Sequence, residues 1–204
     1  MLSNREPPDP GWWLPVKRFA AASALAIVVA AAPCANSAAI TISAERQGDT
    51  IDIRASALLQ ADAETAWRVL TGYDRYTDFI PDLRTSRVVA RRGPRVIVEQ
   101  SGEARVWAFP VPLDITFEII ELPPHSLRSH ARSGTLRALE SSYVLTPTKA
   151  GVRLDYVGHV TPGFGFFGPI ELQAVKQNVA RQFQALAGEI ANQSAAAHAL
   201  SAAN

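Results

Sequence analysis

Four polar residues with suitable chemistry for moving a proton occur in segments that otherwise have the pattern of β-strands: Gln100, Glu140, Tyr143 and Tyr156. An amide or a hydroxyl can polarise a carbonyl group by donating a hydrogen bond, and a carboxylate can accept a proton. Their spacing matches no catalytic motif, and none of them is singled out as a base. The same groups could orient a bound molecule, so binding and catalysis both remain open.

A glycine motif at residues 163–168, GFGFFG, matches the G-x-G-x-x-G pattern between an expected strand and an expected helix. In dinucleotide-binding folds this motif is followed by a second parallel strand with an acid at its end, about 20 residues on. Here the acid at that spacing, Glu189, lies inside the last expected helix. We therefore expect no nucleotide site.

The histidines lack the spacing of metal ligands, and no pair of acids accompanies them. Structural or surface positions are the simplest interpretation. We expect neither a metal nor another cofactor. The histidines are His125, His130, His159 and His198.

The first 38 of the 204 residues have the layout of an export signal. Lys17 and Arg18 precede an uncharged run, residues 19–32, which is too short to span a bilayer but suits a signal peptide. Small residues then allow cleavage after Ser37 or Ala39. An uncleaved anchor is one alternative, and lipidation of Cys34 is another. We expect an exported, periplasmic protein.

The mature chain is electrically neutral, because the leader holds three basic and two acidic residues and leaves 17 of each. A nucleic-acid partner would require a basic excess, so we expect none. The only cysteine, Cys34, lies in the leader, and the mature part can therefore form no internal disulfide. An apolar small ligand is compatible with this composition.

Alternating apolar residues and turn signals predict one α+β domain at residues 39–193, with a frayed or disordered tail at 194–204. Tightly connected strands form an antiparallel, curved sheet, and a long C-terminal helix covers one face of it. Two short helical segments, 63–71 and 73–81, follow the first long strand. The other expected elements are a hairpin and strand within 40–59, strands at 85–91, 95–107, 113–122, 126–133, 136–146 and 151–161, and a helix at 169–192.

Small or polar residues interrupt the inward faces of the expected strands. Gln100, Gly102 and Ala104 follow inward valines on one strand, and Gly158 follows Tyr156 on another. A tightly packed core would use larger apolar side chains there, so this pattern favours a cavity. The glycines could instead mark β-bulges, and both interpretations can hold together.

Aromatic residues gather near the expected strand ends and in the loop before the long helix. They could gate a cavity mouth, or they could plug the cavity as core. We predict that ligand contacts come from this group and from inward positions of the sheet and helix. The predicted ligand-binding residues are Phe79, Gln100, Trp107, Phe109, Phe117, Tyr143, Tyr156, Phe164, Phe166 and Phe183.

Two passages carry a resemblance to a known family. Residues 66–81, AWRVLTGYDRYTDFIP, and residues 139–147, LESSYVLTP, resemble START-like (SRPBCC) domains of the polyketide cyclase/dehydrase and lipid-transport group, including its coenzyme Q-binding branch. The chain departs from the branch pattern at Gly72, at Thr77, and at Tyr143, where tryptophan is frequent. The resemblance implies a helix-grip fold with an apolar cavity between the sheet and the C-terminal helix.

Three functions are compatible with these features. The first is a carrier that binds a lipid, isoprenoid or quinone, with transient membrane contact. The second is a cyclase or aromatase acting on an aromatic or polyketide-like substrate. The third is a protein-interaction module with a filled core. The arginines that could touch lipid headgroups, or lie on a solvated hairpin, are Arg84, Arg87, Arg91, Arg92 and Arg95.

Overall fold

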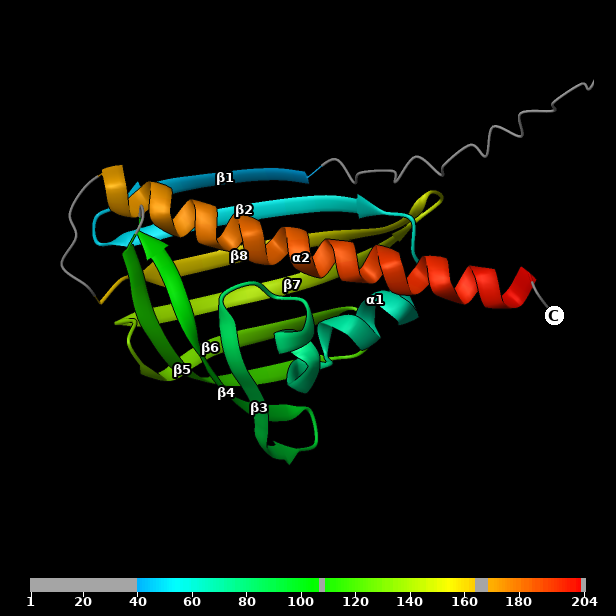
Figure 1. Ribbon diagram of the computed structural model, residues 1–204, viewed down its shortest axis with the longest axis horizontal. Helices are drawn as coiled ribbons and strands as arrows, with labels where there is room; N and C mark the ends of the chain where they lie inside the picture. Colours follow the sequence, from blue (N-terminus) through cyan, green and yellow to red (C-terminus); the bar gives the residue numbers. More distant parts are fainter. Residues whose placement is uncertain (1–39, 107–108, 164–168, 203–204) are drawn as a thin grey trace, which may run out of the picture. The chain divides into compact units, whose positions relative to one another are not determined.

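A computed structural model describes residues 40–106, 109–163 and 169–202. Eight antiparallel strands form one sheet, in the order β1-β2-β8-β7-β6-β5-β4-β3, and the long helix α2 crosses one face of it (Figure 1). The elements are β1 (Ile40–Gln47), β2 (Thr50–Leu59), α1 (Ala63–Leu70), the 3₁₀ helix η1 (Tyr73–Asp78), β3 (Leu83–Arg92), β4 (Arg95–Val106), β5 (Phe109–Leu122), β6 (Ser126–Gly134), β7 (Ala138–Thr148), β8 (Gly151–Thr161) and α2 (Pro169–Ala202).

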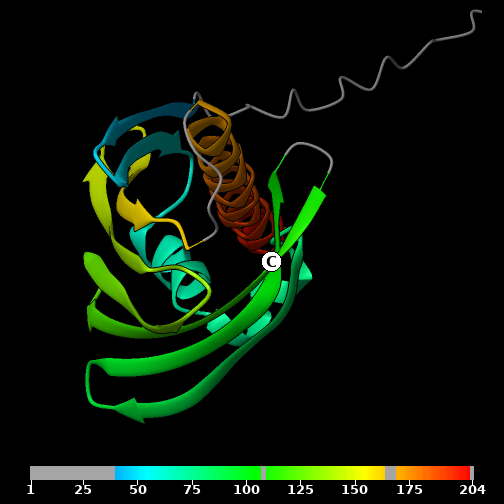
Figure 2. The same ribbon diagram turned by 90° about the vertical axis from the view of Figure 1, so that its left-hand side faces the viewer.

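The sheet curls around α2, so that the helix lies between the β1–β2 edge and the β4–β5 hairpin (Figure 2). All pairings between neighbouring strands are antiparallel, as tight connections require. The predicted α+β class, the curved sheet and the covering helix are confirmed. Apolar residues of every second strand position therefore face the helix and form one core.

Asp62, a residue type favoured as an N-cap, stands directly before α1. The Asp62 carboxylate accepts a hydrogen bond from the Thr65 backbone N–H at 2.7 Å, which satisfies a donor that has no partner within the helix. This bond and burial have opposite effects on the pKa of Asp62, and the hydrogen bond dominates, so the pKa is lowered. After Gly72 the chain continues as η1, and the Tyr76 hydroxyl donates to the Leu70 carbonyl oxygen at 2.6 Å.

The proline-containing segment at residues 110–112 is part of β5, whereas we expected the strand to begin at residue 113. Pro110 and Pro112 pair with β4 only, because β6 reaches β5 no further than the Ile115–Gly134 pair. Proline lacks the N–H that a second neighbouring strand would need, and this end of β5 has no second neighbour. The prolines are therefore compatible with the strand.

Helix α2 continues to Ala202, where we expected a frayed or disordered tail from residue 194. Ser194 is completely buried, and Gln193 donates a hydrogen bond to Glu189 one turn earlier at 2.7 Å. The following residues are mainly alanines, which have the highest helix propensity. The last turns run past the end of the sheet in Figure 1.

The two glycines that suggested bulges differ. At Gly102 the β3–β4 register shifts between Leu83 and Thr85, so a bulge is present there. A Cβ atom on Gly102 would lie 2.4 Å from the Asp82 carbonyl oxygen, so only glycine allows this approach. At Gly158 the pairing is regular on both sides, and a Cβ atom would instead meet the Tyr156 hydroxyl at 2.4 Å. Gly158 makes room for that tyrosine.

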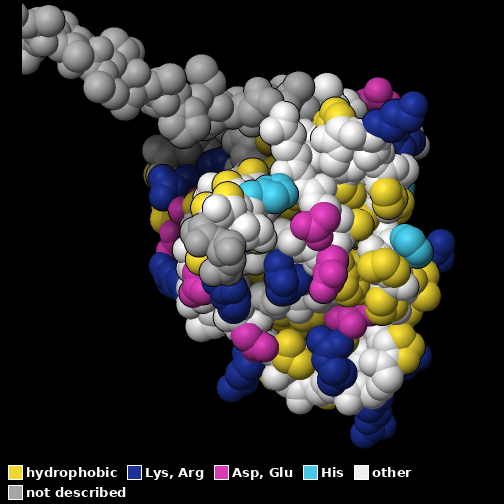
Figure 3. Space-filling view, turned by 90° about the vertical axis from the view of Figure 1, so that its right-hand side faces the viewer, with side chains coloured by type: hydrophobic (Ala, Val, Ile, Leu, Met, Phe, Trp, Pro, Cys, Tyr) yellow, Lys and Arg dark blue, Asp and Glu magenta, His cyan; other side chains and the backbone are white. Residues whose placement is uncertain are grey.

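The predicted leader, residues 1–38, lies outside the described residues. Within the described ranges, no helix is long and apolar enough to cross a membrane. Acidic and basic side chains are interspersed on the face of the molecule shown in Figure 3.

Candidate ligand-binding chamber

Two adjoining cavities lie between α2 and the concave face of the sheet. Together they are called the chamber, and each cavity is one lobe of it. The apolar lobe, about 140 Å³ in volume, is lined mainly by aliphatic side chains, among them Leu83, Leu113, Ile115, Leu136, Val175 and Val179. The tyrosine lobe, about 130 Å³, is lined by Tyr73, Tyr76, Tyr143 and Tyr156 together with Ser129 and Ser141. The residues that line both lobes are Leu83, Gln100, Phe117, Leu139, Tyr156 and Gln182.

Small residues on β4 create the space, as the sequence indicated. Gln100, Gly102 and Ala104 occupy alternate positions and all three line the apolar lobe. The first half of α2 faces them with Val175 and Val179, which are only partly buried. The short side chains of Gly102 and Ala104 leave a gap that the valines do not fill.

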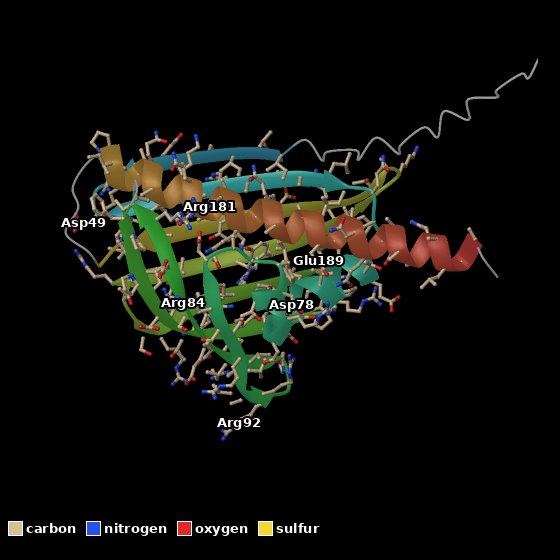
Figure 4. All side chains as sticks on the ribbon, viewed as in Figure 1. Asp49, Asp78, Arg84, Arg92, Arg181 and Glu189 are labelled. Atoms are coloured by element: carbon tan, nitrogen blue, oxygen red, sulfur yellow. The ribbon has the colours of Figure 1, made fainter. Side chains whose placement is uncertain are left out.

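A polar network joins α2 to β4 beside the apolar lobe. The Asp82 carboxylate pairs with Arg105 of β4 at 3.0 Å and with Arg181 of α2 at 3.2 Å, and Arg181 is labelled in Figure 4. The Asn178 side chain accepts a hydrogen bond from the Arg105 backbone N–H at 3.0 Å. Its amide group also donates a hydrogen bond to the Arg105 backbone carbonyl oxygen at 2.9 Å. The bonds from Arg105 lower the pKa of Asp82, against a smaller effect of burial.

The other acidic residues at the wall of the apolar lobe are also paired. Glu103 forms an ion pair with Arg84, and Glu171, which is buried, forms one with Arg46 of β1. With Asp82 these are the only acids that line this lobe among the described residues, and each is neutralised by an arginine. The wall therefore presents little net charge to the chamber.

Tyr73 and Tyr76 use their hydroxyls to bond other elements of the protein. Tyr73 donates to the buried Glu121 at 3.0 Å, and Glu121 also pairs with Arg91 at 2.8 Å. Tyr76 donates to the Leu70 carbonyl oxygen and stacks edge-on against Tyr73, with ring centroids 5.8 Å apart. These two side chains are fixed parts of the wall.

Tyr143 and Tyr156 also line this lobe, with ring centroids 4.8 Å apart. Burial raises the pKa of both hydroxyls: to about 12 for Tyr156, where a hydrogen bond with Ser141 opposes it, and well above the ordinary value for Tyr143. Both therefore remain protonated at neutral pH. The structure records no hydrogen bond from the Tyr143 hydroxyl to a described residue, whereas the Ser129 and Ser141 hydroxyls bond to each other at 2.7 Å.

Four predicted ligand-binding residues line the chamber. Gln100, Phe117 and Tyr156 line both lobes, and Tyr143 lines the tyrosine lobe. The Gln100 amide N–H donates to the Ser86 hydroxyl at 3.1 Å, which leaves its carbonyl oxygen as an acceptor. Their contact with a ligand stays a prediction.

Three other predicted residues do not line either lobe. Phe79 packs against Tyr76, with ring centroids 5.6 Å apart. Phe183 is only 1% exposed and belongs to the hydrophobic core. Phe109, at the start of β5, is 69% exposed. Trp107, Phe164 and Phe166 lie outside the described residues.

Glu140 lies on the outer face of the sheet and not in the chamber, because it alternates with the inward residues Leu139 and Ser141. Its cross-strand neighbours there are His130 and His159. His159 in turn contacts Asp52 at 2.7 Å. Among the described residues, no three His, Cys, Asp or Glu side chains are grouped as metal ligands.

Most arginines of the β3–β4 hairpin bind carboxylates of the same sheet. Arg87 pairs with Glu99 at 2.9 Å, and Arg95 with Glu118 at 3.2 Å. Arg84 and Arg91 have the partners given above, which leaves Arg92, labelled in Figure 4, without an ion pair to a described residue. These ion pairs favour the interpretation of the β3–β4 segment as a solvated hairpin over contact of its arginines with lipid headgroups.

Asp82, Asn178 and Ser141 were not among the site residues predicted from the sequence, whereas Ser129 was expected on an inward face. Asp82 has a left-handed backbone (φ 65°), which no sequence pattern marked. Ser141 could have been found, because it lies two residues before Tyr143 and so on the same face of its strand. Asn178 contacts a strand 73 residues away, and no local signal predicts such a contact.

Comparisons with known proteins agree with the fold. A family model described as polyketide cyclase/dehydrase and lipid transport matches residues 50–194. A search of curated proteins found no match. Assignment to the coenzyme Q-binding branch stays a prediction.

Solved structures similar to this chain share its fold at low sequence identity. A STAR-related lipid transfer protein from Xanthomonas axonopodis is 17% identical, with a TM-score of 0.63 over 74% of this chain and 93% of that one. TTHA0849 from Thermus thermophilus is 18% identical, with a TM-score of 0.61 over 72% and 98%. The Zhui aromatase/cyclase from a Streptomyces strain is 12% identical, with a TM-score of 0.54 over 76% and 93%. This chain belongs to the polyketide cyclase/dehydrase and lipid transport family and has its START-like, helix-grip fold.

Proposed function

We propose that this protein binds or carries an apolar small molecule, a lipid, isoprenoid or quinone, in the chamber under α2. The observation that supports this most directly is the pair of adjoining lobes with mainly apolar walls. An apolar cavity of about 150 Å³ in another protein stays dry and binds benzene, and each lobe here is of similar size. A module with a filled core would have no such chamber.

The distribution of ionisable groups favours binding over catalysis. No carboxylate or imidazole lines the tyrosine lobe among the described residues, and Glu140, our candidate proton acceptor, points outward. Tyr143 and Tyr156 have raised pKa values, which makes them poor bases at neutral pH.

A cyclase or aromatase remains the second candidate, since the two tyrosine hydroxyls can polarise a carbonyl group as neutral donors. The solved aromatase/cyclase of similar fold agrees with this but shares only 12% of its residues. Conversion of a found substrate should fall at least tenfold in Tyr143→Phe or Tyr156→Phe. Turnover that survives both changes would exclude this mechanism.

We further propose export to the periplasm, on the basis of the leader pattern at residues 1–38. The test is N-terminal sequencing of the protein recovered from the periplasmic fraction. A mature terminus near residues 38–40 is expected. An intact Met1 in the soluble cell fraction would contradict the proposal.

Binding is tested by native mass spectrometry and organic extraction of the protein purified from a host of its own kind. We expect a stoichiometric apolar ligand. Val179→Trp, which places an indole in the apolar lobe, should abolish it. Val144→Trp is the matched control, because Val144 is 41% exposed on the outer face. A ligand-free wild type that also rejects an apolar fluorescent probe would overturn the proposal.

A further inference from the structure

The two lobes differ in their polar groups, and this difference bears on the chemistry of the ligand. This inference rests on the proposed function. The wall of the apolar lobe contains acids, but each forms an ion pair with an arginine, so none is an unpaired charge that could bind a charged ligand group. The described wall of the tyrosine lobe contains no charged residue at all. A charged ligand group would lose its hydration there without gaining a partner of opposite charge.

The tyrosine lobe nevertheless offers neutral hydrogen-bonding groups. The hydroxyls of Tyr73 and Tyr76 donate to protein oxygens, so they are already engaged. Tyr143 donates to no described residue, and its raised pKa keeps the proton on its oxygen. At the junction of the lobes, the Gln100 amide nitrogen donates to Ser86, and its carbonyl oxygen has no hydrogen-bond donor among the described residues.

The aromatic residues that line the tyrosine lobe suit a ring. Tyr143 and Tyr156 present aromatic surface on one side, and Tyr76 lies in the wall of the same lobe. Aromatic side chains pack favourably against another ring in offset or edge-on arrangements. The apolar lobe, which has aliphatic walls, continues from this space past Phe117 and Leu139.

We propose that the ligand is an uncharged molecule with a ring that carries a hydrogen-bonding oxygen atom and an apolar chain. The ring lies in the tyrosine lobe, where the Tyr143 hydroxyl donates to its oxygen, and the chain lies in the apolar lobe. Tyr143 is then a specificity-determining residue. It selects for the oxygen atom, while the uncharged wall of the tyrosine lobe selects against carboxylates.

Three probes of one shape separate these contributions: 4-butylphenol, butylbenzene and 4-butylbenzoate. Their affinities are measured by displacement of an apolar fluorescent dye at pH 7, where only the benzoate is charged. We expect 4-butylphenol to bind about fivefold more tightly than butylbenzene, as one net hydrogen bond of about 1 kcal/mol allows. We expect 4-butylbenzoate to bind at least tenfold more weakly than the phenol.

Tyr143→Phe should remove the preference for the phenol and leave the affinity for butylbenzene unchanged. The control is Tyr76→Phe, which removes a hydroxyl of the same lobe that is bonded to Leu70 and should leave the preference intact. Nuclear Overhauser effects should join the probe ring to Tyr143 and its terminal methyl to Val179.

The outcomes distinguish this inference from the proposed function. If no probe displaces the dye, or the dye itself does not bind, the binding function fails and this inference with it. If butylbenzene binds but Tyr143→Phe does not change the preference for the phenol, the chamber stands and the role of Tyr143 is overturned. Benzoate that binds as tightly as phenol overturns the selection against charge, and a reversed pattern of Overhauser effects overturns the orientation.

Discussion

The two halves of α2 contact the same sheet in different ways. From Phe183 onward, the side chains of Phe183, Ala187 and Ile190 are at most 2% exposed and pack into the core. In its N-terminal half, Val175 and Val179 remain partly accessible, because they face the apolar lobe. Both halves carry the same apolar spacing along the helix.

The difference depends on the strands opposite each half. β2 and β8 present Leu59, Val152 and Leu154, all at most 1% exposed, to the closed part of the core. β4 presents Gln100, Gly102 and Ala104 to the chamber. One helix thus provides stability in one half and ligand space in the other, and matched substitutions can test this division.

The largest effect is expected from Leu154→Ala on β8, because Leu154 is completely buried and its loss leaves a cavity that cannot collapse. We expect a loss of unfolding free energy of about 3 kcal/mol or more. Leu139→Ala on the neighbouring strand should cost only about 1 kcal/mol, since Leu139 already borders empty space. Urea denaturation of both variants measures the values, and equal losses would break the comparison.

The next effect comes from glycine. Gly102→Ala forces a Cβ atom against the Asp82 carbonyl oxygen at the wall of the chamber, and we expect a loss of about 2 kcal/mol. Gly188→Ala is the matched control, because nothing lies within 4 Å of its Cβ position in the closed half of α2. There alanine should stabilise by about 0.5–1 kcal/mol. Thermal unfolding of both variants measures these changes in stability. A raised melting temperature in both would contradict the close approach at Gly102.

The smallest effect concerns the ion pairs that join α2 to β4. Asp82→Asn removes the charge and keeps a residue that tolerates the left-handed backbone, at a cost of about 1 kcal/mol at pH 7. The folded-state pKa of Asp82 lies below its ordinary value of 3.8, so its contribution is complete above that pH and disappears as the pH falls through the folded-state pKa. In acid, the free energy of unfolding of the wild type should therefore approach that of Asp82→Asn.

Denaturant titrations of the wild type and Asp82→Asn at pH 7, 4 and 3 measure this trend. A stability difference that stays constant over this range would show that the carboxylate charge contributes nothing. Ligand exchange offers a second readout, since the network borders the apolar lobe. Exchange should be faster in Asp82→Asn at pH 7.

Sequence reasoning predicted the elements and the inward faces well, because strand and helix periodicities are local properties. It placed Gln100, Phe117, Tyr143 and Tyr156 correctly on inward faces. It misplaced Phe183, because apolar spacing alone does not say whether a helical residue faces packed strands or a cavity. It also misplaced Glu140, which alternation with Leu139 and Ser141 would have turned outward.

The sequence by itself determined the α+β class, the order of the elements, the capped start of α1 and the family. These follow from alternation, turn residues and motifs that lie close together in the chain. Only the tertiary structure decided where the chamber lies, which tyrosine hydroxyl is free, and how Asp82 and Asn178 join α2 to β4. The contacts that join Asp82 and Asn178 across α2 and β4 link residues 70 or more positions apart, and their geometry emerges only when the sheet curls around the helix.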